Sequence, residues 1–277
     1  MLTYKEKKNF NIEEMEIEDS KPVDNIFSEK QMRLLTEPLY TSWKPKEHIN
    51  FLVTANVGIF TEILENPIVP DVLLSLEVDI PESRKKKEDL CYYLDKIGKA
   101  PEVVIEIVSN KEGNELDSKL KDYGKIGVLY YTVYDPDLHI LKGNPVSSFK
   151  YKKGMAFRIE KSWFEEVGLG LRLWDGIFEN QHGTWLRWCD YFGEVIPTGK
   201  ELAELERRKT AIEQKQRIEA QKQRMEAQKQ AEVEKNCRME AQKQAEIEKN
   251  YRMEAQRQAE HLAQKLRELG FNPEQDL

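Results

Sequence analysis

One acidic residue, Glu106, stands in the middle of an otherwise apolar and mostly β-branched run, Val103–Ser109. Such a run is typical of a strand buried on both faces, where a carboxylate without a partner is strongly unfavourable. We therefore expect Glu106 to meet a cation or strong hydrogen-bond donors. Two interpretations follow: a salt bridge to a nearby Lys or Arg, or a ligand of a divalent metal.

The metal interpretation needs a second carboxylate, and Asp71 supplies one at the head of a neighbouring predicted strand. Two carboxylates with water suit Mg²⁺ or Mn²⁺, and such an ion promotes phosphodiester hydrolysis by polarising a phosphate oxygen and acidifying bound water. Lys119, on the next predicted helix and one turn before Tyr123, can point back over the sheet to assist that water. Lys121 faces about 200° away from Lys119 and is not expected to share this role.

The elements that must position these residues can be predicted from apolar periodicity and turn signals. We expect a strand within Pro70–Val78, a strand over Val103–Ser109, a helix over Asn114–Ile126, a strand over Val128–Tyr134 and an antiparallel pair at Ser148–Tyr151 and Ala156–Ile159. Strand, helix and strand with short connections form a βαβ unit, so the second and third strands should be parallel. The predicted fold is an α/β mixed sheet flanked by helices and followed by a long C-terminal helix.

Composition and the absence of motifs exclude several classes of protein. The 277 residues carry a net charge of −7, and no apolar run is long enough for a transmembrane helix or a signal peptide. There is no P-loop, Rossmann glycine motif, GxSxG or zinc-ligand spacing, and the four histidines are scattered. Three cysteines without CxxC pairing favour a reducing, cytoplasmic location.

The C-terminal quarter of the chain is different in kind. Residues 200–270 contain 17 Lys and Arg against 14 Asp and Glu, with strong helix formers throughout. Thr198 and Glu201 have the spacing of a capping box, and Gly270 suits the left-handed position after a helix. We therefore predict one uninterrupted helix over residues 198–270.

A seven-residue repeat such as Arg224-Met-Glu-Ala-Gln-Lys-Gln runs through this helix and suggests a coiled coil. The repeat column is weak as a seam, because Met225, Met239 and Met253 alternate with Glu232, Glu246 and Glu260. Two interpretations stay open: a solvated single helix held by i,i+4 charge pairs, or a homo-oligomer or protein partner bound through residues 200–269. The predicted domains are a loosely ordered lead-in (1–25), the α/β domain (26–197), the helix (198–270) and a tail (271–277).

A family resemblance rests on an ensemble of short motifs. They are Pro70-Asp71, Ile105-Glu106-Ile107-Val108-Ser109, Glu115-Leu-Asp-Ser-Lys119, Tyr123, Gly127-Val128, Tyr130-Tyr131 and Asp135-Pro136. Over about residues 30–196 the chain resembles the Uma-two family of bacterial proteins, within the restriction-endonuclease-like PD-(D/E)xK superfamily. The resemblance implies a metal-dependent nuclease acting on DNA, with Asp71 and Glu106 as metal ligands. The superfamily lysine would stand at position 108, where this chain has Val108, so Lys119 would be a migrated lysine.

Two further features bear on nucleic-acid binding. Residues 1–199 carry a net charge of −8, so we expect a modest and salt-dependent affinity for DNA. The basic run Arg84–Lys87 could hold a phosphate backbone or form a solvated loop. Trp163, Trp174, Trp185, Trp188 and Tyr191 are expected to fill the core and brace the root of the helix rather than stack on bases. The competing hypothesis is a catalytically weak or inactive nuclease-fold scaffold that acts through its C-terminal helix.

Overall fold

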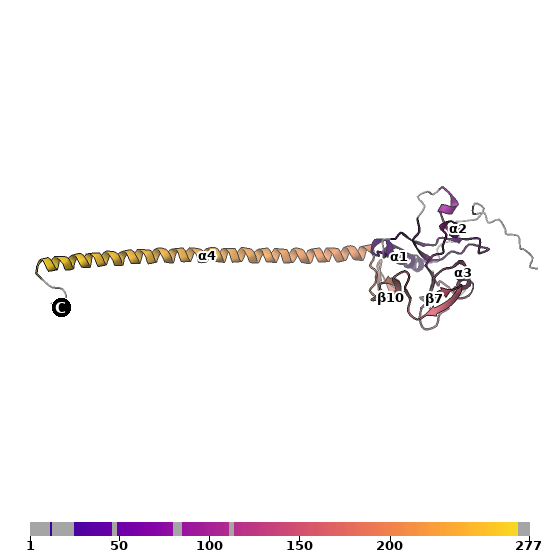
Figure 1. Ribbon diagram of the computed structural model, residues 1–277. Helices are drawn as coiled ribbons and strands as arrows, with labels where there is room; N and C mark the ends of the chain where they lie inside the picture. The colour runs from indigo at the N-terminus through magenta and orange to yellow at the C-terminus, as the bar shows by residue number, and fades with distance from the viewer. Residues whose placement is uncertain (1–11, 13–24, 46–48, 80–84, 111–113, 271–277) are drawn as a thin grey trace, which may run out of the picture. The chain divides into compact units, whose positions relative to one another are not determined.

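The computed structural model describes residue 12 and residues 25–45, 49–79, 85–110 and 114–270. The chain divides into two compact units, residues 1–204 and 205–277. Most of the predicted lead-in, the predicted tail and Arg84 of the basic run lie outside the described residues. Figure 1 shows the labelled elements along the chain.

A six-stranded sheet with the order β1-β3-β5-β6-β7-β8 forms the centre of the first unit. Its strands are β1 (Phe51–Ala55), β3 (Val72–Leu76), β5 (Val103–Ile107), β6 (Tyr130–Tyr134), β7 (Val146–Lys152) and β8 (Met155–Ile159). The neighbours β5 and β6 run parallel, whereas each other adjacent pair runs antiparallel. The predicted mixed sheet, the parallel βαβ unit and the antiparallel pair at its end are therefore confirmed.

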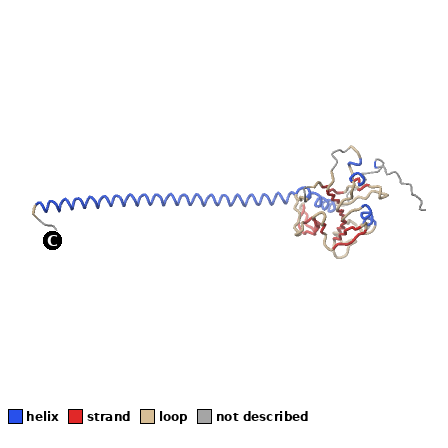
Figure 2. Tube along the Cα trace, viewed as in Figure 1, coloured by secondary structure: helices blue, strands red, loops and turns tan. Residues whose placement is uncertain are grey.

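The remaining elements surround this sheet or follow it. They are α1 (Ile26–Thr41), β2 (Ile59–Phe60), a 3₁₀ turn η3 (Lys87–Asp89), β4 (Tyr92–Tyr93), α2 (Leu94–Ile97), α3 (Ser118–Ile126), β9 (Trp163–Phe164), β10 (Leu169–Phe178), β11 (Gln181–Cys189) and α4 (Gly199–Glu268). Strands β9, β10 and β11 form a second, antiparallel sheet. All of these strands precede the long helix α4 in the chain, and Figure 2 draws strands in red and helices in blue.

Side chains of β5 alternate between two apolar clusters, one on each face of the central sheet. Val103, Ile105 and Ile107 join the cluster that includes Leu35 and Leu39 of α1 and residues of the second sheet. Val104 and Val108 join the cluster that contains Tyr123 and Ile126 of α3. Glu106 lies in phase with Val104 and Val108, so its carboxylate belongs to the α3 face.

Helix α3 begins at Ser118, four residues later than the predicted start at Asn114. The carbonyl of Asn114 accepts hydrogen bonds from the N–H groups of Asp117 and Lys119, both at 3.1 Å, and this closes a turn before the helix. Gly127 ends α3 at φ +90°, a left-handed conformation that favours glycine. Lys119 therefore lies in the first turn of α3 and not in its middle.

The prediction that the tryptophan-rich segment fills the core is confirmed for Trp185 and Trp188 and wrong for Tyr191, which is 76% exposed; Trp163 and Trp174 are half-buried. Trp185 and Trp188 are almost fully buried, and Trp188 Nε1 donates a hydrogen bond of 2.7 Å to the carbonyl of Leu35 in α1. These two rings therefore cannot stack on the bases of a nucleic acid. The guanidinium of Arg187 lies over Trp174 and forms an ion pair of 2.6 Å with Glu201, in the first turn of α4.

Helix α4 runs without interruption for 70 residues, and none of them is buried. Thr198 and Glu201 form the predicted capping box, with Glu201 N–H donating to Thr198 Oγ1 at 3.2 Å and Thr198 N–H donating to Glu201 Oε2 at 2.8 Å. Gly270 has φ +85°, as expected for the residue after a helix. Among the described residues, no helix is both long enough and apolar enough to cross a membrane.

Candidate functional site

The sheet register brings Asp71 next to Glu106. Strand β3 pairs antiparallel with β5 so that Val72 lies opposite Ile105, which places the preceding Asp71 beside Glu106. Asp71 is fixed there, because its Oδ2 accepts a hydrogen bond of 2.6 Å from the N–H of Ile107. Both carboxylates therefore stand at the carboxyl end of β5.

Helix α3 supplies two partners for the Glu106 carboxylate. Lys119 Nζ lies 2.9 Å from Glu106 Oε2, and the Tyr123 hydroxyl donates a hydrogen bond of 2.5 Å to Oε1. The two partners are four residues apart and so occupy one face of the helix. The Glu106 side chain is 2% exposed, whereas that of Lys119 is 30% exposed. The ammonium group of Lys119 thus contacts the buried carboxylate of Glu106 and is itself partly exposed to solvent.

Burial dominates the proton affinity of this cluster. It raises the pKa of Glu106 to about 8; Lys119 opposes this rise, the Asp71 charge adds to it, and the Tyr123 hydrogen bond opposes it. For Lys119, burial lowers the pKa, but the charge of Glu106 and a hydrogen bond to it, followed by Asp71 and Glu115, outweigh burial and leave it raised. Burial together with the Glu106 charge also raises the pKa of Tyr123, which keeps its proton as a hydrogen-bond donor.

Position 108, where the superfamily lysine would stand, holds an apolar side chain that belongs to the core. Val108 is 1% exposed and packs in the same cluster as Tyr123 and Val104. No ammonium could occupy this place without a buried counter-charge. The cation that reaches Glu106 comes from α3 instead, at Lys119.

Two further residues lie in this cluster: the sequence indicates Glu115 as an acidic neighbour that could contribute to the site, whereas it gives Tyr123 no part in it. Tyr123 appeared only as an apolar position of the helix, although its i+4 spacing from Lys119 indicates a shared face. Glu115 lies four residues before Lys119, and its Oε1 is 3.9 Å from Lys119 Nζ. Its other oxygen, Oε2, is buried and has no hydrogen-bond partner among the described residues. Lys119 therefore lies between two carboxylates.

The oxygen donors of this cluster fit a hard divalent cation with few protein ligands. Asp71 and Glu106 are carboxylates held side by side, and the unpaired Glu115 Oε2 is a further buried oxygen nearby. Within the described part of the chain, however, no group of three or more His, Cys, Asp or Glu is arranged to hold a metal. An ion would therefore rely on one or two carboxylates and complete its shell with water and phosphate oxygens, as Mg²⁺ commonly does.

Other polar residues considered from sequence lie away from this cluster. Lys121 points to solvent and pairs with Asp117 at 2.7 Å, as its helical position predicted. Glu77 and Asp79 are acidic residues directly after β3, where the sequence favours a strand end that faces solvent, and both are exposed. In the basic run, Lys86 Nζ is 3.5 Å from Glu88 and its side chain is 68% exposed, which leaves both interpretations of the run open.

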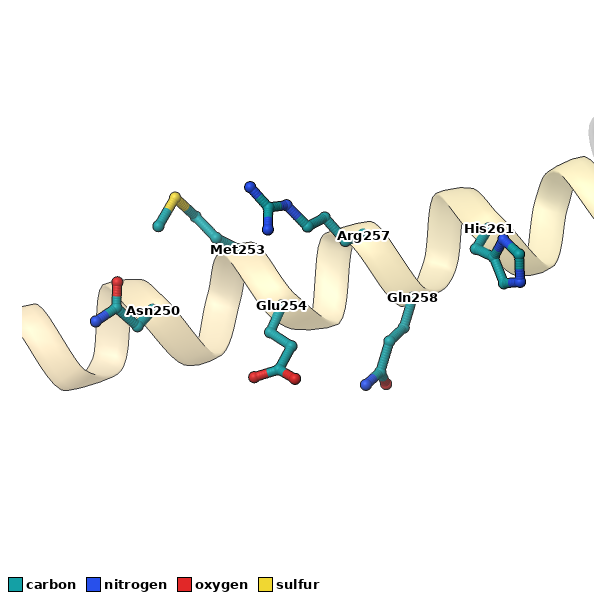
Figure 3. A pocket seen from close by; sticks show the side chains of 6 residues that line it. All are labelled: Asn250, Met253, Glu254, Arg257, Gln258 and His261. Carbon is teal, nitrogen blue, oxygen red and sulfur yellow. The ribbon is translucent and has the colours of Figure 1, made fainter.

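A hollow on α4 offers no comparable chemistry. Figure 3 shows its six lining residues, all on this one helix: Asn250, Met253, Glu254, Arg257, Gln258 and His261. Met253 and Arg257 project to one side of the helix, and Glu254 and Gln258 project to the opposite side. The hollow is thus the space between exposed side chains of a single helix.

Comparison with known proteins gives one family match, over the first half of the chain. Residues 6–143 match the family model Uma2, which is described as a putative restriction endonuclease. No curated protein and no solved structure matches the chain. The matched residues include Asp71, Glu106 and Lys119, and they end before β7, the second sheet and α4. The chain therefore belongs to the Uma2 family of restriction-endonuclease-like proteins.

Proposed function

We propose that this protein is a metal-dependent nuclease that hydrolyses phosphodiester bonds in DNA. Asp71 and Glu106 would hold Mg²⁺ or Mn²⁺, and Lys119 would assist the attacking water. One observation carries this proposal: a lysine ammonium lies 2.9 Å from a buried carboxylate, beside a second carboxylate fixed by a backbone N–H. Family membership agrees with nuclease chemistry and with a divalent metal.

The burial of the three groups suggests separate roles. Asp71 and Glu106 have their backbones in or next to a central strand, so they are rigid ligands. Tyr123 orients Glu106 through its 2.5 Å hydrogen bond, which leaves one carboxylate edge toward Lys119. Lys119 is the partly exposed member and can approach a water or a phosphate oxygen that arrives from solvent.

Glu115 would keep Lys119 in place during this work. If Glu106 held a cation, its attraction for the ammonium would weaken, and Glu115, in the turn before α3 and 3.9 Å from Lys119 Nζ, would still attract that group. The ion, when bound, would polarise the scissile phosphate and lower the pKa of water. Lys119 would then orient that water and offset negative charge that develops on the phosphate.

A cleavage assay with matched variants tests the proposal. Wild-type protein is incubated with supercoiled plasmid and with single- and double-stranded oligonucleotides, in Mg²⁺, Mn²⁺ or a chelator. We expect cleavage that the chelator stops, and a loss of about 100-fold or more in Glu106→Gln and Lys119→Met. Glu160→Gln is the control and should cut DNA as the wild type does, because Glu160 is an exposed residue directly after the edge strand β8.

Calorimetry with Mn²⁺ separates binding from turnover. Glu106→Gln and Asp71→Asn should lose metal binding, whereas Lys119→Met should keep it. The proposal fails if wild-type protein cuts none of these substrates and binds neither metal.

The length and full exposure of α4 favour a second candidate function, that of an interaction protein. None of the 70 residues of α4 is buried, although Met225, Met239 and Met253 recur in one heptad column. An interaction protein that uses the nuclease fold as a scaffold would bind a partner or a second copy through residues 200–269. Sedimentation can test this candidate on the full chain and on a form that ends at Glu204, which keeps the Arg187–Glu201 ion pair. A mass above that of the monomer in the full chain, but not in the shortened form, supports the interaction function.

A further inference from the structure

A cavity of about 180 Å³ lies at the carboxyl ends of the parallel strands β5 and β6. It is lined by residues of three segments: Asn25, Phe27 and Ser28 at the start of α1, Val108 and Ser109 after β5, and Pro136 and Asp137 after β6. In α/β sheets the crevice outside the carboxyl ends of parallel strands is where ligands commonly bind. This cavity is distinct from the carboxylate and lysine cluster, whose α3 residues do not line it.

The hydroxyl of Ser28 in the cavity lining has no partner. Ser28 is 4% exposed, and its Oγ makes no hydrogen bond within the described residues. Its backbone N–H is already taken by Asn25 Oδ1 at 2.8 Å, the N-cap of α1. A buried hydroxyl without a partner is unfavourable and marks a place where a bound group would complete the hydrogen bonding.

The wall formed by Pro136 and Asp137 is held rigidly. Asp135, directly before it, is fully buried and accepts three hydrogen bonds from the N–H groups of His139, Ile140 and Leu141, at 2.9, 2.7 and 2.7 Å. The loop that carries Asp137 is therefore fixed from within. A preformed wall reduces the entropic cost of binding a ligand.

The lining chemistry favours a small, neutral, planar ligand with both donors and acceptors. Serine hydroxyls can donate or accept, the Asn25 NH₂ group donates because its Oδ1 already accepts from the Ser28 N–H, and the Asp137 carboxylate accepts only. That carboxylate repels a phosphate or another anion, even beside the start of a helix, and attracts an amino group. Phe27 and Pro136 add apolar surface. The volume is below the roughly 300–1,000 Å³ of sites for drug-sized molecules and corresponds to about six waters, close to one small ring system.

We propose that this cavity binds a nucleobase, with the base edge directed to Ser28 and Asp137. That the base belongs to a nucleic-acid strand rests on the proposed function. Ser109 follows Glu106 by three residues, which is roughly 10 Å along an extended strand. Nucleotides in a duplex strand are spaced at roughly 3.4 Å. An unpaired base a few positions from the cleaved phosphate would therefore reach the cavity by crossing the carboxyl edge of the sheet from the α3 face toward the start of α1. Its amino group would then set a base preference.

Saturation-transfer NMR on the full chain tests this inference with four probes: adenosine, cytidine, guanosine and thymidine. We expect millimolar binding of at least one nucleoside that carries an exocyclic amino group, and weaker binding of thymidine. Ser28→Ala removes a hydroxyl that has no partner, so the variant should fold, and it should weaken binding about five- to ten-fold. Ser42→Ala, at the other end of α1, is the matched control and should bind as the wild type does.

Three results would overturn the inference: no nucleoside binds, the affinity of Ser28→Ala is unchanged, or inorganic phosphate displaces the nucleoside. Binding should persist in Glu106→Gln, which lacks the proposed metal ligand. Nucleoside binding by a protein that cuts no DNA would thus uphold the cavity and reject the nuclease proposal. Cleavage of DNA by a protein that binds no nucleoside would uphold the nuclease proposal and reject the nucleobase cavity.

Discussion

Two regions of this molecule contain glutamate–cation pairs of nearly the same length, with very different surroundings. In the sheet domain, Lys119 lies 2.9 Å from a Glu106 side chain that is 2% exposed. On α4, Arg238 lies 2.8 Å from Glu234, and the two side chains are 77% and 67% exposed. The distance between the charges therefore does not determine the chemical properties of an ion pair, whereas its exposure to solvent does.

Burial gives the Glu106 pair its chemical properties. Removing water strengthens the attraction between the charges but makes either charge alone costly, and it raises the pKa of Glu106 to about 8. On α4 water screens each pair, and the strong helix formers of the sequence are the main local support for the helix. The buried pair suits a site that holds cations and protons, whereas the exposed pairs keep a long helix solvated.

The largest expected effect is the loss of the buried cation. Lys119→Met leaves Glu106 without its counter-charge, and we expect the free energy of unfolding at pH 9 to fall by about 3 kcal/mol. Urea unfolding followed by tryptophan fluorescence measures it, because all five tryptophans lie between residues 43 and 188. Lys121→Met, two residues away and paired with Asp117 in solvent, is the control and should unfold as the wild type does. Equal effects of the two substitutions would mean that burial does not distinguish the pairs.

The next effect is a pH dependence that belongs to the buried pair. Burial raises the pKa of Glu106 from 4.5 to about 8, so between these values the folded state binds a proton that the unfolded state has released. The contribution of Glu106 to stability therefore falls as pH rises from about 4.5 to about 8, by an amount on the order of a few kcal/mol. Relative to Glu106→Gln, which does not titrate, the wild type should lose stability across this window. A constant difference between the two proteins from pH 5 to pH 8 would contradict the raised pKa.

The smallest effect is expected on α4. Exposed i,i+4 pairs contribute about 0.3–0.5 kcal/mol each, so Arg238→Gln should lower the helical signal at 222 nm only slightly. High salt should reduce even this difference, since it screens exposed charges. A large, salt-insensitive loss of helix in this variant would show that the Glu234–Arg238 region is covered by another surface in solution.

Much of the central fold could be predicted because its signals are local. The β-branched run at Val103–Ile107, the amphipathic segment before Gly127 and the capping box at Thr198 each determine an element through their own residues. The contact of Lys119 with Glu106 also follows from short-range geometry, since a helix that returns over its strand aligns one face with it. Whether these residues catalyse a reaction stays a prediction.

The parts that could not be predicted depend on contacts between distant segments. Helix α1, with Leu35 and Leu39, was not identified, because its apolar face is defined by the sheet it covers. The bond of Tyr123 to Glu106 was missed because a tyrosine at an apolar helical position fits a core equally well. The pairing of Arg187 with Glu201 joins β11 to the start of α4, a relation that no local spacing encodes.

The buried carboxylate of Asp135 has a consequence for hydrogen exchange. Its two oxygens accept the amide protons of His139, Ile140 and Leu141, in a segment that is neither helix nor strand. Amide protons in a loop commonly exchange with solvent quickly, because a small local opening is enough to expose them. Here all three are released only if a fully buried aspartate leaves the core. We expect these amides to exchange at the rates of the sheet that precedes them, so that the loop opens only together with β6.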